Sequence, residues 1–157
     1  ICINNAGYLQ LKPFIELSEQ EWDKSLNINL RSVFLCSQAA FKLMSQSQDR
    51  NFIININSLS GMQSVEKFAG MSAYIASKSA MTGLTEALAV EGKAYNVHVN
   101  AIAPGAIATQ MFEENFASAG FSAGAKPDNI AKMILAICDP DGLGLTSGTL
   151  IPIYCNA

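Results

Sequence analysis

The residues with the clearest chemical potential are Tyr74 and Lys78, which lie four positions apart in a segment of helical character. This spacing places both side chains on one face of a helix. A tyrosine phenol has an ordinary pKa of about 10 and transfers protons poorly near pH 7. An ammonium about 4 Å away stabilises the phenolate by roughly 4 kcal/mol at an effective dielectric near 20, which predicts a phenol pKa lowered by up to about three units. The pair is therefore a candidate general acid/base, and a surface helix pair is the alternative interpretation.

Three further groups follow predicted elements at places where a site would form. Ser58 comes directly after a predicted strand at residues 52–56, with Ser60 as a competing hydroxyl. Open α/β sheets bind ligands at the carboxyl ends of their strands, which favours Ser58. Residues 104–109 leave the next predicted strand at the same edge. Asn29 lies within the first long helix, where it either takes part in chemistry or satisfies backbone groups at a helix bend.

The elements that must position these residues follow from apolar periodicity and turn signals. Ser18 with Glu21 is a capping-box pattern, and it predicts a helix over 19–44 that bends near Asn27 and Asn29. Further helices are predicted at 73–95 and 126–138, and strands at 1–3, 52–56, 97–102 and 149–154. Residues 104–124 read as a loop or lid. Strands that alternate with helices predict an α/β fold with a mostly parallel sheet.

Composition restricts the class of protein. The chain of 157 residues fits one domain, half of its residues are hydrophobic, and 15% are charged. A net charge of −3 argues against a nucleic-acid or anionic-membrane partner. We find no leader sequence and no apolar run long enough for a membrane span, so we expect a soluble, cytoplasmic protein. The four cysteines lack metal-ligand spacing, so we expect reduced thiols and no metal site.

Two other patterns have structural interpretations. His98 alternates with valines in a predicted strand, which is typical of a structural residue. Gly142, Gly144 and Gly148 faintly resemble a dinucleotide fingerprint, but they precede a strand rather than a helix. We therefore interpret these three glycines as turn residues.

Taken in order, five motifs closely resemble the short-chain dehydrogenase/reductase family. They are the Asn-Asn-Ala-Gly sequence at 4–7, Asn29, the Asn-Ile-Asn-Ser sequence at 55–58, the Tyr74/Lys78 pair, and residues 104–109. The resemblance implies a doubly wound Rossmann-type parallel sheet with flanking helices in three layers. It also implies hydride transfer between NAD or NADP and a small-molecule carbonyl or alcohol substrate.

The resemblance also implies roles for single residues. Tyr74 would pass a proton to or from the substrate oxygen, and Lys78 would lower the phenol pKa and hold the nicotinamide ribose. Ser58 would hydrogen-bond the substrate oxygen, and Asn29 would hold a water that relays the proton. The cofactor cleft would be lined by Asn4, Ala6, Gly7, Pro104 and Gly105, and the carboxamide would be bound by Thr109 and the backbone near Ile107.

The chain departs from the family pattern in one large respect. Residues 1–157 contain no glycine-rich pyrophosphate turn after a first strand, so they resemble the carboxyl-terminal part of such an enzyme. We expect one partial Rossmann-type domain, catalytic when complete. The alternative is a non-catalytic remnant or oligomerisation module that has lost cofactor binding. The apolar segment with Met111, Phe112, Phe116 and Phe121 suggests a partly apolar substrate, and the family resemblance suggests a homodimer or homotetramer built through the two long helices.

Overall fold

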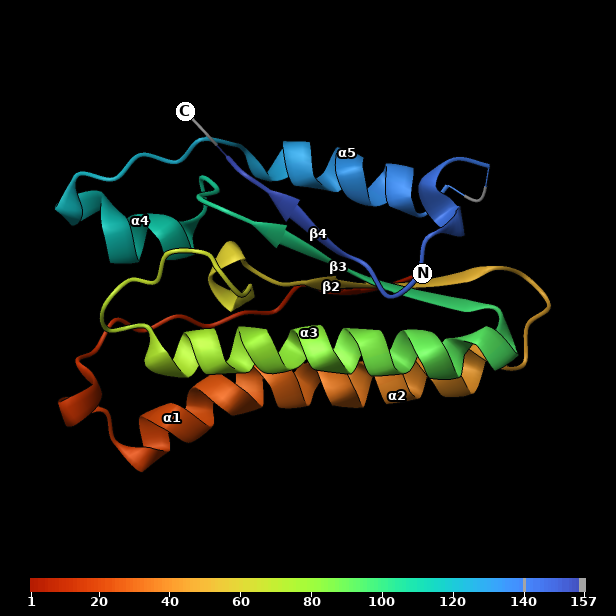
Figure 1. The fold of residues 1–157 in the computed structure, drawn as a ribbon, viewed down its shortest axis with the longest axis horizontal. Coiled ribbons are helices and arrows are strands. Elements are labelled where there is room, and N and C mark those ends of the chain that lie inside the picture. The colour runs from red at the N-terminus through yellow and green to blue at the C-terminus, as the bar shows by residue number, and fades with distance from the viewer. Residues whose placement is uncertain (140, 156–157) are drawn as a thin grey trace.

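The computed structural model describes residues 1–139 and 141–155, in which four strands form one parallel sheet (Figure 1). The strands lie in chain order: β1 (Cys2–Asn4), β2 (Asn51–Ile56), β3 (Val97–Pro104) and β4 (Leu150–Ile153). The register pairs Ile53 with Val99 and Ile102 with Ile151. Because all four strands run in one direction, their carboxyl ends meet at one edge of the sheet. The predicted α/β fold with a parallel sheet is confirmed.

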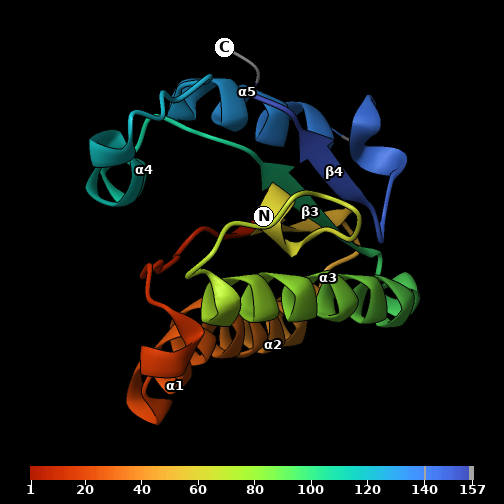
Figure 2. The same cartoon turned by 60° about the vertical axis from the view of Figure 1, so that its left-hand side comes forward.

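Helices cover both faces of the sheet. Figures 1 and 2 show α2 (Ser32–Met44) and α3 (Ser72–Gly92) side by side on one face, and α5 (Pro127–Ile137) on the other. The helix α1 (Glu19–Leu26) extends the α2 side toward the carboxyl edge of the strands. The result is the three-layer α/β/α arrangement that the sequence predicts.

Successive residues of β2 pack into different halves of the core. Ile53 lies in a cluster with Met44, Ala89, Val97 and Val99, on the side of α2 and α3. Ile54 lies in a second cluster with Phe52, Ile102, Ile130 and Ile137, on the side of α5. Side chains alternate across a strand, so a central strand covered on both faces must be apolar at consecutive positions. This requirement explains the consecutive apolar residues Phe52, Ile53 and Ile54 of β2.

The helix predicted over 19–44 is continuous but changes its winding in the middle. Ser18 and Glu21 form a complete capping box at its start. Between α1 and α2, the segment η2 (Asn27–Arg31) is a π-helical turn, which contains one extra residue and bends the axis. The bend predicted near Asn27 and Asn29 therefore corresponds to this π-helical turn.

The segment expected to be a loop or lid contains a helix. Residues of α4 (Gln110–Phe116) and the 3₁₀ turn η5 (Ala117–Ala119) lie within 104–124. Thr109 begins α4, because its hydroxyl accepts a hydrogen bond from the backbone N–H of Phe112 at 3.3 Å. Further 3₁₀ turns are η1 (Phe14–Glu16), η3 (Leu59–Gly61), η4 (Lys93–Tyr95) and η6 (Leu143–Leu145).

The structure also bears on the predictions for the glycines, the cysteines and membrane spans. Gly144 lies in η6 and Gly148 has a φ of +78° just before β4, so their interpretation as turn residues is confirmed. All four cysteines are free thiols. Within residues 1–139 and 141–155, no helix is long and apolar enough to cross a membrane.

Candidate active site

Tyr74 and Lys78 lie on the face of α3 that packs against the sheet. The Lys78 side chain is only 3% exposed, and its Nζ donates a hydrogen bond to the backbone carbonyl of Ile56 at 2.8 Å. The same Nζ lies 5.7 Å from the centroid of the Tyr74 ring. The helix spacing therefore brings the two groups together beside the end of β2, as the sequence predicts.

Ser58 meets this pair from the end of β2. Its backbone is extended (φ −160°), so the chain continues past the sheet edge before it turns into η3. The Ser58 hydroxyl accepts a hydrogen bond from the backbone N–H of Ser60 at 3.1 Å, and its side chain also hydrogen-bonds to Tyr74. The competing hydroxyl of Ser60 also faces the cavity described below, but Ser58 is the serine that contacts the phenol.

The pKa values of the pair differ from the expectation. Burial raises the pKa of the Tyr74 phenol, and the Ser58 hydrogen bond only partly opposes this rise. Burial also lowers the pKa of Lys78 to about 8. The expected lowering of the phenol pKa by the ammonium is therefore wrong for this chain by itself. Both groups lose water when α3 packs on the sheet, and desolvation disfavours the charged form of each.

Asn29 lies in the π-helical turn η2 and is fully buried. Its Oδ1 accepts from the backbone N–H of Tyr8 at 2.7 Å, and its Nδ2 donates to the Tyr8 carbonyl at 2.9 Å and to Ser77 Oγ at 3.0 Å. Ser77 Oγ in turn donates to the Tyr74 carbonyl at 2.7 Å. Asn29 thus connects the segment after β1 to the backbone of the candidate acid/base, and π-helical turns often occur at functional sites.

The predicted cofactor residues near the start of the chain divide into two groups. Asn4 is 7% exposed, and its Nδ2 donates to Asn55 Oδ1 at 2.7 Å and to Ser37 Oγ at 3.1 Å. Its side chain thus belongs to a buried polar network and does not line the cavity. Ala6 is exposed and Gly7 is half-buried, with Asn29 Oδ1 at 3.9 Å from the position of a Cβ on Gly7.

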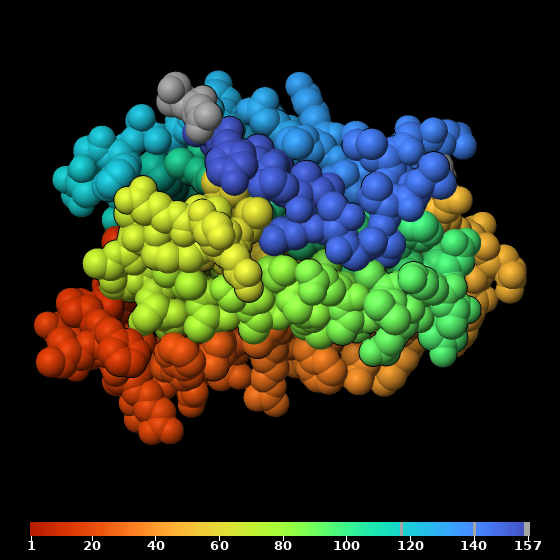
Figure 3. Space-filling view, in the orientation of Figure 1, coloured from red at the N-terminus to blue at the C-terminus, as the bar shows by residue number. Residues whose placement is uncertain are grey.

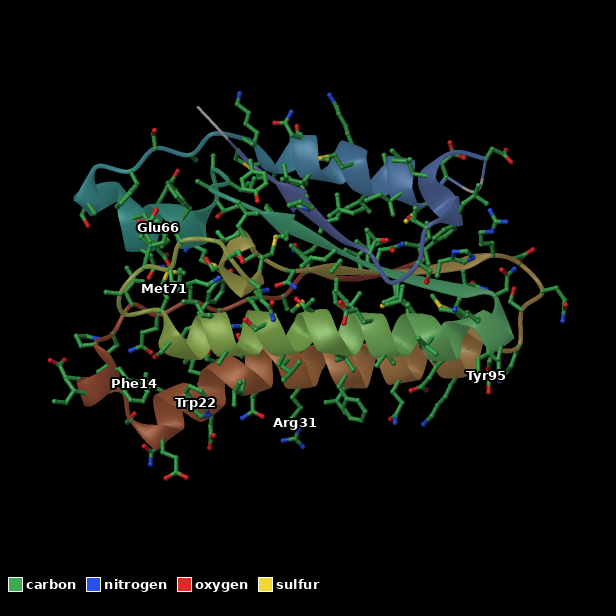
Figure 4. The ribbon with its side chains drawn as sticks, in the orientation of Figure 1. Phe14, Trp22, Arg31, Glu66, Met71 and Tyr95 are labelled. Atoms are coloured by element: carbon green, nitrogen blue, oxygen red, sulfur yellow. The ribbon has the colours of Figure 1, made fainter. Side chains whose placement is uncertain are left out.

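Pro104, Gly105, Ile107 and Thr109 line a cavity of about 560 Å³ together with Ser58 and Tyr74. This cavity lies at the carboxyl edge of the sheet, between α4 and the start of α3. Figure 4 shows Met71, another lining residue, at this end of the molecule, far from Tyr95 at the other end of α3. The cavity thus brings together Ser58, Tyr74, residues 104–107 and Thr109 from three separate segments of the chain.

The cavity also contains residues that the sequence analysis did not select. The predicted apolar residues Met111, Phe112, Phe116 and Phe121 all line it, but so do Leu9, Glu66, Phe68 and Tyr154. The sequence signal that could have identified Glu66 and Phe68 as site residues is their position in the chain, between the Ser58 and Tyr74 motifs. His98 is not among the lining residues; its Nδ1 lies 3.3 Å from the Thr146 carbonyl, which fits the predicted structural role. No cluster of metal-ligating side chains occurs among the described residues.

Comparison with known proteins agrees with this geometry. The family model described as short chain dehydrogenase matches residues 1–120. A cyclopentanol dehydrogenase from Comamonas sp. is 40% identical over 112 residues, which cover 71% of this chain and 43% of that protein. The first curated relatives are longer, and the aligned part of the chain spans 43% to 61% of their lengths.

Two solved structures show the same architecture. The structure of 4-hydroxyisoleucine dehydrogenase complexed with NADH matches with a TM-score of 0.83 at 29% identity, over 98% of this chain and 66% of that one. The structure of ElxO with NADP bound matches with a TM-score of 0.84 at 26% identity, over 98% of this chain and 64% of that one. With a family model that matches most of its residues, the chain belongs to the short chain dehydrogenase family.

Proposed function

We propose that the protein is an NAD- or NADP-dependent oxidoreductase that interconverts a small-molecule alcohol and the corresponding carbonyl compound. The observation that carries this proposal is that Tyr74, Ser58, residues 104–107 and Thr109 line one cavity at the carboxyl edge of a parallel sheet. This edge is where open α/β sheets bind their ligands. The NADH and NADP complexes of the two similar structures support the choice of cofactor.

The residues of this chain fit the nicotinamide half of such a cofactor, which supplies or accepts the hydride when it is bound. The Lys78 ammonium has three donors, and among the described residues its one hydrogen-bond acceptor is the Ile56 carbonyl. The remaining donors would bind the ribose hydroxyls. Thr109 and the backbone near Ile107 would bind the carboxamide, and Ala6, Gly7, Pro104 and Gly105 would line the cleft.

Tyr74 would exchange the proton with the substrate oxygen. Its raised pKa keeps the phenol protonated at neutral pH, the form that donates to the oxygen of a carbonyl compound during reduction. The Ser58 hydroxyl, which hydrogen-bonds to Tyr74, would bind the same substrate oxygen and stabilise charge that develops there. Because the Asn29 amide already contacts Tyr8 and Ser77, its contacts support a positioning role more than the expected water relay.

The setting of this enzyme follows from its surface and its thiols. Four free cysteines fit the reducing cytoplasm, where we place the protein. We also propose that it assembles as a homodimer or homotetramer through α2 and α3. Exposed apolar side chains on these helices, including Phe34, Leu35 and Val90, support this assembly.

The substitution Tyr74→Phe tests the proposed acid/base. In the natural full-length protein we expect kcat to fall by about 10²- to 10⁴-fold, because a positioned proton donor contributes about this factor. The change in NADH or NADPH fluorescence on binding should persist. Tyr95→Phe, in the turn η4 that follows the far end of α3, is the matched control and should keep wild-type turnover.

Two outcomes would contradict this proposal. Wild-type turnover by Tyr74→Phe would remove the phenol from its role. A wild-type protein that binds neither NADH nor NADPH at millimolar concentration would instead favour the non-catalytic interaction module.

A further inference from the structure

The cavity beside Tyr74 has an unequal distribution of charge. Among the described residues that line it, Glu66 is the only one with an ionised side chain at neutral pH. The others are apolar residues or neutral polar residues such as Ser58, Asn57 and Thr109. The one formal charge in the lining is therefore negative, whereas the Lys78 ammonium, 5.7 Å from the centroid of the Tyr74 ring, is not among the lining residues.

Among the described residues, the Glu66 carboxylate forms no ion pair. The adjacent Lys67 points back to its own loop, where Nζ donates to the backbone carbonyls of Ser60 and Met62. The ion pair formed by the described residues, Lys12 with Glu21, involves another part of the chain. Within the described residues, Glu66 thus keeps its charge and its hydrogen-bond acceptors free for a molecule in the cavity.

An aromatic wall lines the same cavity. Phe68 and Phe121 meet edge to face with ring centroids 6.0 Å apart, and Phe121 meets Phe116 in the same way at 6.1 Å. Phe112 continues the chain of rings at 5.4 Å from Phe116. Figure 3 shows the loop before α3 and the segment after α4 next to each other on this face of the molecule. Figure 4 labels Glu66 in the same region of the molecule.

These two features together define what the cavity accepts. Tilted and edge-on rings of this kind bind an aromatic or alicyclic body, and they also attract a cation over their faces. A free carboxylate binds a protonated amine and repels a second carboxylate. A carboxylate on the substrate would be placed against Glu66 without a cation in the cavity wall to pair with it.

We infer that Glu66 is a specificity-determining residue, which selects an apolar alcohol or ketone that carries a protonated amine and rejects one that carries a carboxylate. This inference rests on the proposed function for the reacting alcohol, but the charge selection itself is a property of binding. The Glu66 side chain is exposed to solvent, so the effect is a moderate one that salt screens.

The experiment uses three probes of matched shape with the natural full-length protein: 4-fluorobenzylamine, 4-fluorobenzyl alcohol and 4-fluorobenzoate. Dissociation constants at pH 7 are measured by ¹⁹F NMR titration at low and high salt. We expect the amine to bind about three- to tenfold more tightly than the benzoate, with the alcohol in between, and the difference to shrink at high salt. In Glu66→Gln the three dissociation constants should agree to within about twofold. The thermal melting curve should be unchanged, because Glu66 has no ion-pair partner to lose.

Glu113→Gln is the matched control, because Glu113 is an exposed carboxylate of α4 that does not line the cavity. It should keep the wild-type order. Equal affinities for amine and benzoate in the wild type, or the same ratio in Glu66→Gln as in the wild type, would overturn the inference. A parallel assay of NAD- and NADP-linked oxidation of neutral alcohols separates the two proposals: turnover without charge selection removes only the role of Glu66, whereas charge selection without turnover removes only the oxidoreductase function.

Discussion

Burial controls the two ionisable groups of the site at the scale of single residues. Lys78 is almost completely buried, and desolvation lowers its pKa to about 8; the same effect raises the pKa of Tyr74. At neutral pH the site therefore contains a protonated phenol beside a charged ammonium. The base form of Tyr74 needs higher pH, so oxidation of an alcohol should accelerate as the pH rises above neutrality.

The Lys78 pKa also predicts how stability depends on pH. The folded protein releases this proton near pH 8, whereas the unfolded chain releases it near 10.5, so the unfolded chain binds more protons between these values. The free energy of unfolding should therefore rise between about pH 8 and 10, by up to about 3 kcal/mol, because the folded protein no longer carries a buried charge. The raised pKa of Tyr74 acts in the opposite direction above about pH 10. Urea unfolding of Lys78→Met should lack this rise.

Lys93→Met is the control, because Lys93 is an exposed lysine at the end of the same helix. It should reproduce the wild-type dependence on pH. A rise that persists unchanged in Lys78→Met would show that another group produces it.

At the scale of elements, α3 has two glycines in different surroundings. A Cβ on Gly83 would have no atom within 4 Å, and Gly83 is exposed in the middle of the helix. A Cβ on Gly92 would lie 2.2 Å from the backbone carbonyl oxygen of Val97. The end of α3 can approach the start of β3 this closely only because Gly92 has no side chain. This approach sets how closely the end of α3 packs on the start of β3.

The two glycines give opposite predictions for one substitution. Gly83→Ala should increase the free energy of unfolding by about 0.5–1 kcal/mol, because alanine loses less backbone entropy in a helix. Gly92→Ala should decrease it by at least about 2 kcal/mol, because backbone atoms must move apart. Urea unfolding of both variants at one pH makes the comparison. A stabilising Gly92→Ala would mean that α3 does not approach β3 as described.

At the scale of the whole molecule, apolar side chains remain exposed on both outer layers. Leu35 of α2 is 50% exposed, and Leu145 of η6, on the α5 side of the sheet, is 72% exposed. Exposed apolar patches often mark interfaces between protein chains. The proposed assembly uses the α2 and α3 layer. A charged side chain introduced on α2 should therefore weaken the assembly, whereas one introduced on the α5 side should not.

Leu35→Lys should reduce the mass measured by size-exclusion chromatography with light scattering, because a buried, unpaired charge destabilises an interface. Leu145→Lys should leave the mass of the assembly unchanged. The reverse result would place the interface on the α5 side.

Much of the fold could be predicted because its determinants are local in the chain. The Ser18 capping box, the apolar run of β2 and the spacing of Tyr74 and Lys78 are properties of short segments, and the structure has each element within a few residues of its predicted bounds. The helix α4 was missed because its signal, the capping residue Thr109, stands within a segment rich in alanine and glycine.

The sequence by itself determined the order of the strands and helices and which chemical groups follow them. Only the tertiary structure decided that Phe68 contacts Phe121 across two loops, that Glu66 is the charged residue among those described that line the cavity, and that the Tyr74 pKa rises rather than falls. The physical reason is that helix capping and side-chain periodicity act over a few residues, whereas burial and contacts between loops depend on parts of the chain that meet only when the helices pack on the sheet.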